Sequence, residues 1–176
     1  MKRTVFLWEL VGFGVTSLAG TLLHFLYDWL GEASWIAPFS GVNESTFEHM
    51  KLMFWPMLFY AVFESFFFRE YKSFWCVKLR GTLIGLALIP LIFYTWGGVI
   101  GKPPDLVNIS IFFVSAAIAY LYQARALNNS DTVCASSRRA KLLFAVIALM
   151  FVIFTFKTPR LAIFKDPLTG QYGIIR

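Results

Sequence analysis

Two histidines and nearby carboxylates flank two apolar segments of the chain, and side chains of these types could bind a metal ion or transfer protons. His24 lies four residues before Asp28 at the end of the first segment, and His49 lies at the start of the second. Residues four apart share a helix face, so His24 and Asp28 could interact directly. Imidazole and carboxylate donors suit Zn²⁺ or another first-row divalent ion with an open position for water. His24, Asp28 and His49 are therefore the candidate catalytic residues, and Glu44 joins them as a candidate metal ligand.

A second set of polar side chains lies nearer the other ends of the same segments. Helical periodicity places Glu9 on the histidine-bearing face of the first segment, and Tyr60 and Glu64 on that of the second. If the two segments are antiparallel neighbours, the ionisable groups meet in two layers. We expect the layer without histidines to be a structural network in which the two glutamates pair with Arg69 or Arg80.

A simpler interpretation of residues 43–51 is the start of a helix. Ser45 and Glu48 fit the S-x-x-E capping box, in which the serine caps the helix and the glutamate closes back on it. Lys51 can pair with Glu48, and Glu44 lies just outside the helix. His49 is the residue that capping does not explain.

Other chemistry has less support. The chain contains no H-E-x-x-H, nucleophile elbow or phosphate loop. His24 and Asp28 could equally form a structural hydrogen bond or a proton-sensitive pair. Ser17 and Thr21 lie on the His24 face, so a serine–histidine arrangement also remains open.

Five apolar segments must position these residues. The chain is 58% hydrophobic with a mean hydropathy of +0.65, well above a soluble domain. The charge-free run 81–101 is long enough to cross a hydrocarbon core about 30 Å thick, and no run shows the alternation of a β-barrel. We therefore predict an all-α integral membrane protein, a single domain over residues 1–176 with helices at about 4–28, 47–68, 81–101, 106–124 and 140–157.

The basic residues predict the orientation of this bundle. They concentrate before the first helix and in the second and fourth connections, whereas the opposite connections hold only Lys51 and Lys102. The positive-inside rule then places the N-terminus in the cytoplasm and the loop 29–46 outside. The tail 158–176 is also expected outside, although it carries three basic residues and follows a fourth, Lys157. The net charge of +6 is thus a topology signal, and we expect membrane lipids and a second copy of the chain, not nucleic acid, as partners.

The two cysteines give a further expectation. Cys76 and Cys134 both fall in predicted cytoplasmic loops, where thiols stay reduced. We expect no disulfide between them, and two thiols alone do not make a zinc site.

Three stretches carry a resemblance: LLHFLYDW (22–29), FSGVNESTFEHMK (39–51) and LAIFKDPLTGQYGI (161–174). With them the chain resembles a family of small uncharacterised membrane proteins of Gram-positive bacteria that share N-E-S-x-x-E-H and D-P-x-T-G-x-Y-G segments. The resemblance brings no activity or cofactor, but it implies a multi-pass protein of the bacterial plasma membrane. It implies that the three stretches form one unit, and Asp166 then joins the candidate site.

Three functions remain in view. A polar site at the extracytoplasmic ends of the first two helices fits a metal-dependent membrane enzyme that acts on a lipid or other apolar substrate. A small transporter or channel subunit would instead need a continuous polar path from His24 and His49 to Glu9 and Glu64. A structural or partner-binding protein would keep its polar groups fully paired.

Overall fold

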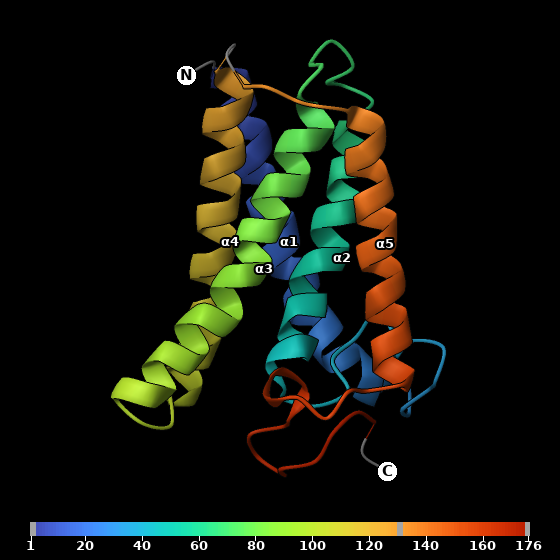
Figure 1. Ribbon diagram of the computed structural model, residues 1–176, viewed down its shortest axis with the longest axis vertical. Helices are drawn as coiled ribbons and strands as arrows, with labels where there is room; N and C mark the ends of the chain where they lie inside the picture. The colour runs from blue at the N-terminus through green and yellow to red at the C-terminus, as the bar shows by residue number, and fades with distance from the viewer. Residues whose placement is uncertain (1–2, 130–131, 175–176) are drawn as a thin grey trace.

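The protein is a bundle of five α-helices. The computed structural model describes residues 3–129 and 132–174. The elements are α1 (Arg3–Trp29), α2 (Thr46–Glu64), α3 (Phe74–Val99), α4 (Asp105–Asn128), α5 (Ser137–Phe156) and the short 3₁₀ helix η1 (Ala162–Phe164). In Figure 1 the start of α1 lies at one end of the elongated bundle, and the tail after α5 packs over the other. The predicted all-helical fold with five helices is confirmed.

Four of the five helices, α1, α3, α4 and α5, are long and apolar enough to cross a membrane. α2 differs because Glu48, Lys51 and Glu64 interrupt its apolar sequence, and all three are buried. It contacts α1, α3, α4, α5 and η1, so it is the central helix of the bundle. Its charged side chains therefore face protein neighbours.

α1 packs closely against its neighbours through two glycines. A Cβ at Gly12 would lie 2.5 Å from a ring carbon of Tyr60 and 2.6 Å from one of Tyr120. A Cβ at Gly20 would lie 2.5 Å from the Phe112 ring. Glycines allow such close approach, as small residues do between membrane helices. The polar face of α1 is thereby held against α2 and α4.

α2 starts as the sequence predicts, with one difference. The Ser45 hydroxyl accepts a hydrogen bond from the Glu48 amide at 3.4 Å, which confirms the N-cap. The Glu48 carboxylate, however, accepts from the Val42 amide at 3.0 Å, and the Ser45 amide donates to Asn43 Oδ1 instead. The capping box is therefore half formed, and its glutamate ties down the preceding loop.

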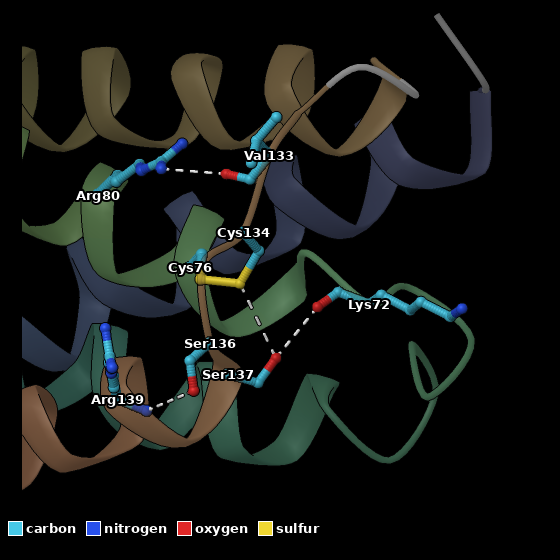
Figure 2. Close-up of a disulfide and its surroundings, with 8 residues drawn as sticks. All are labelled: Lys72, Cys76, Arg80, Val133, Cys134, Ser136, Ser137 and Arg139. Atoms are coloured by element: carbon cyan, nitrogen blue, oxygen red, sulfur yellow. Dashed lines mark hydrogen bonds between the residues drawn. A yellow bond between two sulfur atoms is a disulfide. The ribbon is translucent and has the colours of Figure 1, made fainter.

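α3 begins at Phe74, about two turns before the predicted start at residue 81. The earlier start places Cys76 and Lys78 on a helix instead of in a loop. Figure 2 shows the consequence for the first of them, a disulfide between Cys76 and Cys134 with a Cα–Cα distance of 5.6 Å. The expectation of two reduced thiols is wrong, because the segment before α5 folds back over the start of α3.

Two polar contacts hold that segment beside the disulfide. Arg80 Nη2 donates to the Val133 carbonyl at 3.1 Å, and Ser137 Oγ donates to the Lys72 carbonyl at 3.0 Å (Figure 2). We call this end of the bundle, with the connections 65–73 and 129–136, the disulfide end.

The opposite end, which we call the histidine end, is formed by the loop 30–45 and the tail 157–174. The tail closes on itself through a bridge between Lys165 and Tyr172. Asn43 Nδ2 donates to the Gly173 carbonyl at 2.8 Å, so loop and tail are joined directly. The three stretches that carried the family resemblance therefore lie together.

Candidate metal centre

Three of the predicted site residues converge at the histidine end. His24, Glu44 and His49 each offer one ligand atom, and these atoms lie within 4.8 Å of one another. Nε2 of His24 lies 3.6 Å from Glu44 Oε1, and Nε2 of His49 lies 3.7 Å from Glu44 Oε2. Two ligands of one tetrahedral zinc ion lie roughly 3.3 Å apart, given zinc–ligand bonds of about 2.0–2.2 Å. The spacing thus needs only a small adjustment to hold an ion.

His49 is oriented by its own helix. Its Nδ1 lies 3.0 Å from the Ser45 carbonyl oxygen, one turn back along α2. A carbonyl only accepts, so Nδ1 carries the proton and the neutral ring keeps its lone pair on Nε2. Nε2 is the atom that faces Glu44. A backbone carbonyl that fixes the tautomer in this way is typical of metal-binding histidines.

His24 lies near the end of α1, where the following loop returns to it. Its ring stacks on Phe25, with centroids 5.0 Å apart. The Gly41 amide donates to the Leu23 carbonyl at 3.3 Å, and Ser40 is hydrogen-bonded to the same carbonyl. These bonds turn the loop so that Glu44, three residues further on, meets the histidine.

A buried ion pair secures the same loop to the bundle. Lys51 is 0% exposed, and its ammonium lies 2.6 Å from Glu48 Oε2. It also donates to the Ala37 carbonyl at 2.8 Å and to Thr155 Oγ1 of α5 at 3.0 Å. The predicted pairing of Lys51 with Glu48 is confirmed. This network positions the loop and leaves Glu44 available as a ligand.

The cluster borders a largely apolar pocket of about 480 Å³. Its walls come from α1, α2 and the first half of α4, with one residue from the tail: Phe25, Leu52, Ile109, Phe112, Phe113 and Leu168. Asn108 also lines it, and the Oδ1 atom of this side chain is buried without a hydrogen-bond partner among the described residues. The side chains of His24, Glu44 and His49 are 34%, 39% and 21% exposed. A ligand in the pocket could therefore reach all three.

The second predicted layer also exists, but its basic partner is different. The Lys78 ammonium lies 2.6 and 2.8 Å from the two carboxylate oxygens of Glu9 and is paired with Glu64. It also donates to Gln123 Oε1 at 3.0 Å. The expected partner, Arg69 or Arg80, is wrong because α3 starts early enough to carry Lys78 into the bundle.

Two network residues, Lys78 and Gln123, were missed by sequence reasoning. The apolar surroundings of Lys78, in FWCVKL, were the available signal that it enters a helix interior. Tyr60 is close by, and its hydroxyl donates to the Trp8 carbonyl at 2.7 Å. Its ring centroid lies 5.8 Å from Lys78 Nζ. It thus borders the network without a hydrogen bond to it.

Residues 2–174 match the protein family described as "Family of unknown function (DUF6512)". The chain belongs to this family. No match is found among curated proteins or among solved structures. Membership in the family carries no activity, so the function must be argued from the geometry of the site.

Two predicted site residues, Asp28 and Asp166, lie outside the cluster of possible metal ligands. Asp28 is exposed, and within the described residues this cluster, which we call the metal-type cluster, consists of His24, Glu44 and His49 alone. Asp166 is buried, but its Oδ1 accepts from the amides of Leu168 and Thr169. Its role is to close the turn of the tail. The loop carboxylate Glu44 occupies the position expected for Asp28.

Proposed function

We propose that this protein is a multi-pass membrane protein that binds a divalent first-row transition metal ion through His24, Glu44 and His49. We further propose that the ion acts on an apolar or lipid substrate in the adjoining pocket. The observation that carries the proposal is the convergence of three donors, two of them imidazoles, at the mouth of that pocket.

Membrane insertion rests on the surface of the bundle. Four helices have the length and composition of spans. Large apolar side chains along them are exposed, among them Leu10, Leu18, Leu91, Leu121 and Leu142. Lipid is the environment that such a surface fits. The distribution of basic residues favours a cytoplasmic disulfide end, whereas the Cys76–Cys134 disulfide favours an oxidising, extracytoplasmic side for the same end. The two signals oppose each other, and the proposed metal site does not depend on the orientation.

The ligand set suits a reactive metal ion better than a structural one. Structural zinc usually has four protein ligands, whereas catalytic zinc has three and keeps one position for water or substrate. His24, Glu44 and His49 provide three. An ion held by these residues would supply Lewis acidity and would lower the pKa of a water molecule in the open position, so metal-assisted hydrolysis is the reaction class we propose.

The pocket supports an amphipathic substrate. Phe112 and Phe113 are among its aromatic walls, whereas the metal-type cluster and Asn108 form its polar part. An acyl chain could lie among the aromatic and aliphatic walls with its polar group at the ion. The unpaired Asn108 oxygen would then accept a hydrogen bond from that polar group.

Metal binding by the purified protein tests this function. Protein in detergent micelles, stripped with chelator, is titrated with Zn²⁺ in a calorimeter, and bound metal is counted by mass spectrometry. We expect one ion per chain and at least a tenfold weaker affinity in His24→Ala and His49→Ala. Asp28→Ala is the matched control, because it removes an exposed carboxylate at the same end of the bundle and should keep the affinity. Equal binding by the wild type and both histidine variants would overturn the proposal.

A small transporter or channel is less well supported. It requires a polar path along α1 between His24 and Glu9. Gly12 and Gly20 lie between these two residues. The rings of Tyr60 and Tyr120 pack directly against Gly12, and the ring of Phe112 packs against Gly20. Ion flux in liposomes that is abolished in His49→Ala would favour this alternative.

A further inference from the structure

The cluster of Glu9, Glu64 and Lys78 inside the disulfide end has a chemistry that the metal centre does not use. We infer that this cluster is a proton-binding site, with one exchangeable proton held on its carboxyl groups. The inference stands independently of the metal centre, which lies at the other end of the bundle.

Burial and geometry define the site. The three side chains are 0–2% exposed and come from α1, α2 and α3. The Lys78 ammonium contacts Glu9, Glu64 and Gln123, which uses all three of its N–H donors. No further donor of Lys78 remains for the second oxygen of Glu64.

The charges of the cluster do not balance when every group is ionised. Two carboxylates face one ammonium, and the other polar neighbours on the packed helices are neutral: Gln123, Tyr60 and Tyr120. The Tyr120 hydroxyl is bonded to Thr16 Oγ1 at 2.7 Å. An uncompensated charge in a buried site costs several kcal/mol, so uptake of one proton is favoured over a net negative charge.

The hydrogen bonds show which carboxyl oxygen of the cluster lacks a donor. Both oxygens of Glu9 accept from Lys78, as expected for a carboxylate. Glu64 is paired with Lys78 through Oε2, whereas Oε1 is buried and receives no donor from the described residues. A buried carboxyl oxygen without a donor is unfavourable while the group is charged. The proton is therefore held within the pair of Glu9 and Glu64, which share Lys78.

A groove gives the proton a route for exchange. A pocket of about 190 Å³ between α1 and α4 is lined by Glu9 and Tyr120 together with apolar side chains. Leu10 and Leu121, which also line it, are 51% and 46% exposed, so the side of the groove faces lipid, and water must enter along α1 from the Phe6 end, nearest the disulfide end of the bundle. Exchange then needs only a transient water molecule beside Glu9, without separation of the helices.

Infrared spectroscopy of the protein in detergent micelles detects the proton directly. We expect the wild type at neutral pH to show the carbonyl stretching band of a buried protonated carboxyl group, shifted when the solvent is D₂O. The band should disappear in Glu64→Gln and persist in Asp28→Asn, the control with an exposed carboxylate. The D₂O shift in the wild type needs no variant, so it remains informative if Glu64→Gln does not fold.

The pH dependence of thermal unfolding gives a second measurement. A native state that holds one more proton than the unfolded chain loses stability as the pH rises. The wild-type melting temperature should therefore fall as the pH rises from about 4.3, where a glutamate of the unfolded chain loses its proton, until the native cluster loses its own, and Glu64→Gln should flatten that fall. Absence of the protonated-carboxyl band in the wild type, with equal pH slopes for both proteins, would overturn the inference and leave a fully charged structural network.

Discussion

Two lysines of this bundle are enclosed almost completely, and their surroundings differ in one respect. Lys51, at the histidine end, faces a single carboxylate, Glu48, and its remaining donors are taken by a backbone carbonyl and a threonine hydroxyl. Lys78, at the disulfide end, faces two carboxylates, Glu9 and Glu64. The first cluster is neutral when fully ionised, whereas the second is not.

This difference separates a structural role from a chemical one. The balanced pair, Glu48 and Lys51, joins the loop 30–45 to α2 and α5. This attachment holds Glu44 at the candidate metal centre. The unbalanced cluster joins four helices, and its excess carboxyl group needs a proton. A buried charge can therefore serve as an anchor or as a binding site, and a count of charges distinguishes the two.

Removal of either lysine should have the largest effect on stability. Lys51→Met and Lys78→Met each leave a buried carboxylate without its positively charged partner. Breaking a buried pair in this way lowers the free energy of unfolding by about 3–5 kcal/mol. Denaturant titration in detergent micelles measures the free energy of unfolding. Arg69→Met serves as control, because it removes a positive charge from an exposed position. A loss below about 1 kcal/mol in either lysine variant would contradict the assigned burial of that cluster.

Removal of one carboxylate should lower the free energy of unfolding by different amounts in the two clusters. Glu48→Gln leaves Lys51 as an unpaired buried cation and should cost about 3 kcal/mol. Glu64→Gln leaves Lys78 balanced by Glu9, so the change in the free energy of unfolding should stay below about 1 kcal/mol. The same titration compares both variants at neutral pH. Equal losses would mean that the excess carboxylate is fully charged and needed by Lys78.

The balanced cluster was predictable from sequence, and the unbalanced one only in part. Glu48 and Lys51 are three residues apart on one helix, so local spacing is enough to pair them. Glu9 and Glu64 were placed in one layer by the helical period of two antiparallel segments. Their partner Lys78 was assigned to a loop, because three other basic residues nearby suggested that the helix starts later.

At the candidate metal centre, too, the sequence predicted the residues on helices better than the contacts that tertiary structure creates. His24 and His49 were expected to meet, since each lies on the polar face of its helix at the same level. Asp28 was favoured over Glu44 because it lies on the same helical turn as His24, whereas Glu44 is brought in by a loop. The bonds of Gly41 and Ser40 to α1 that fix this loop depend on tertiary structure, as does the disulfide between cysteines 58 residues apart.

The disulfide is a further difference between the two ends of the bundle. Its removal should lower the free energy of unfolding less than removal of a buried lysine and more than a change at the metal centre. Cys134→Ser frees the segment 129–136 from α3 and should cost about 2–3 kcal/mol through the larger entropy of the unfolded chain. The Lys78 cluster should keep its protonated-carboxyl band, because its contacts do not include this segment. Thermal melts of the oxidised, reduced and Cys134→Ser proteins measure the effect. Loss of the band on reduction would show that the disulfide is needed to hold Lys78 in place.

The smallest effect is expected at the metal centre, where side chains are partly exposed and no direct hydrogen bond joins the three ligands. His24→Ala without metal should change the free energy of unfolding by less than about 1 kcal/mol, in contrast to both lysine clusters. Metal at about 100 times the wild-type dissociation constant should stabilise the wild type by about 2.7 kcal/mol and the variant, with at least tenfold weaker affinity, by about 1.4 kcal/mol or less. Melting curves with and without Zn²⁺ make this comparison. A large loss of unfolding free energy in metal-free His24→Ala would mean that His24 has a structural role. A metal ligand is expected to contribute to stability mainly when the metal is bound.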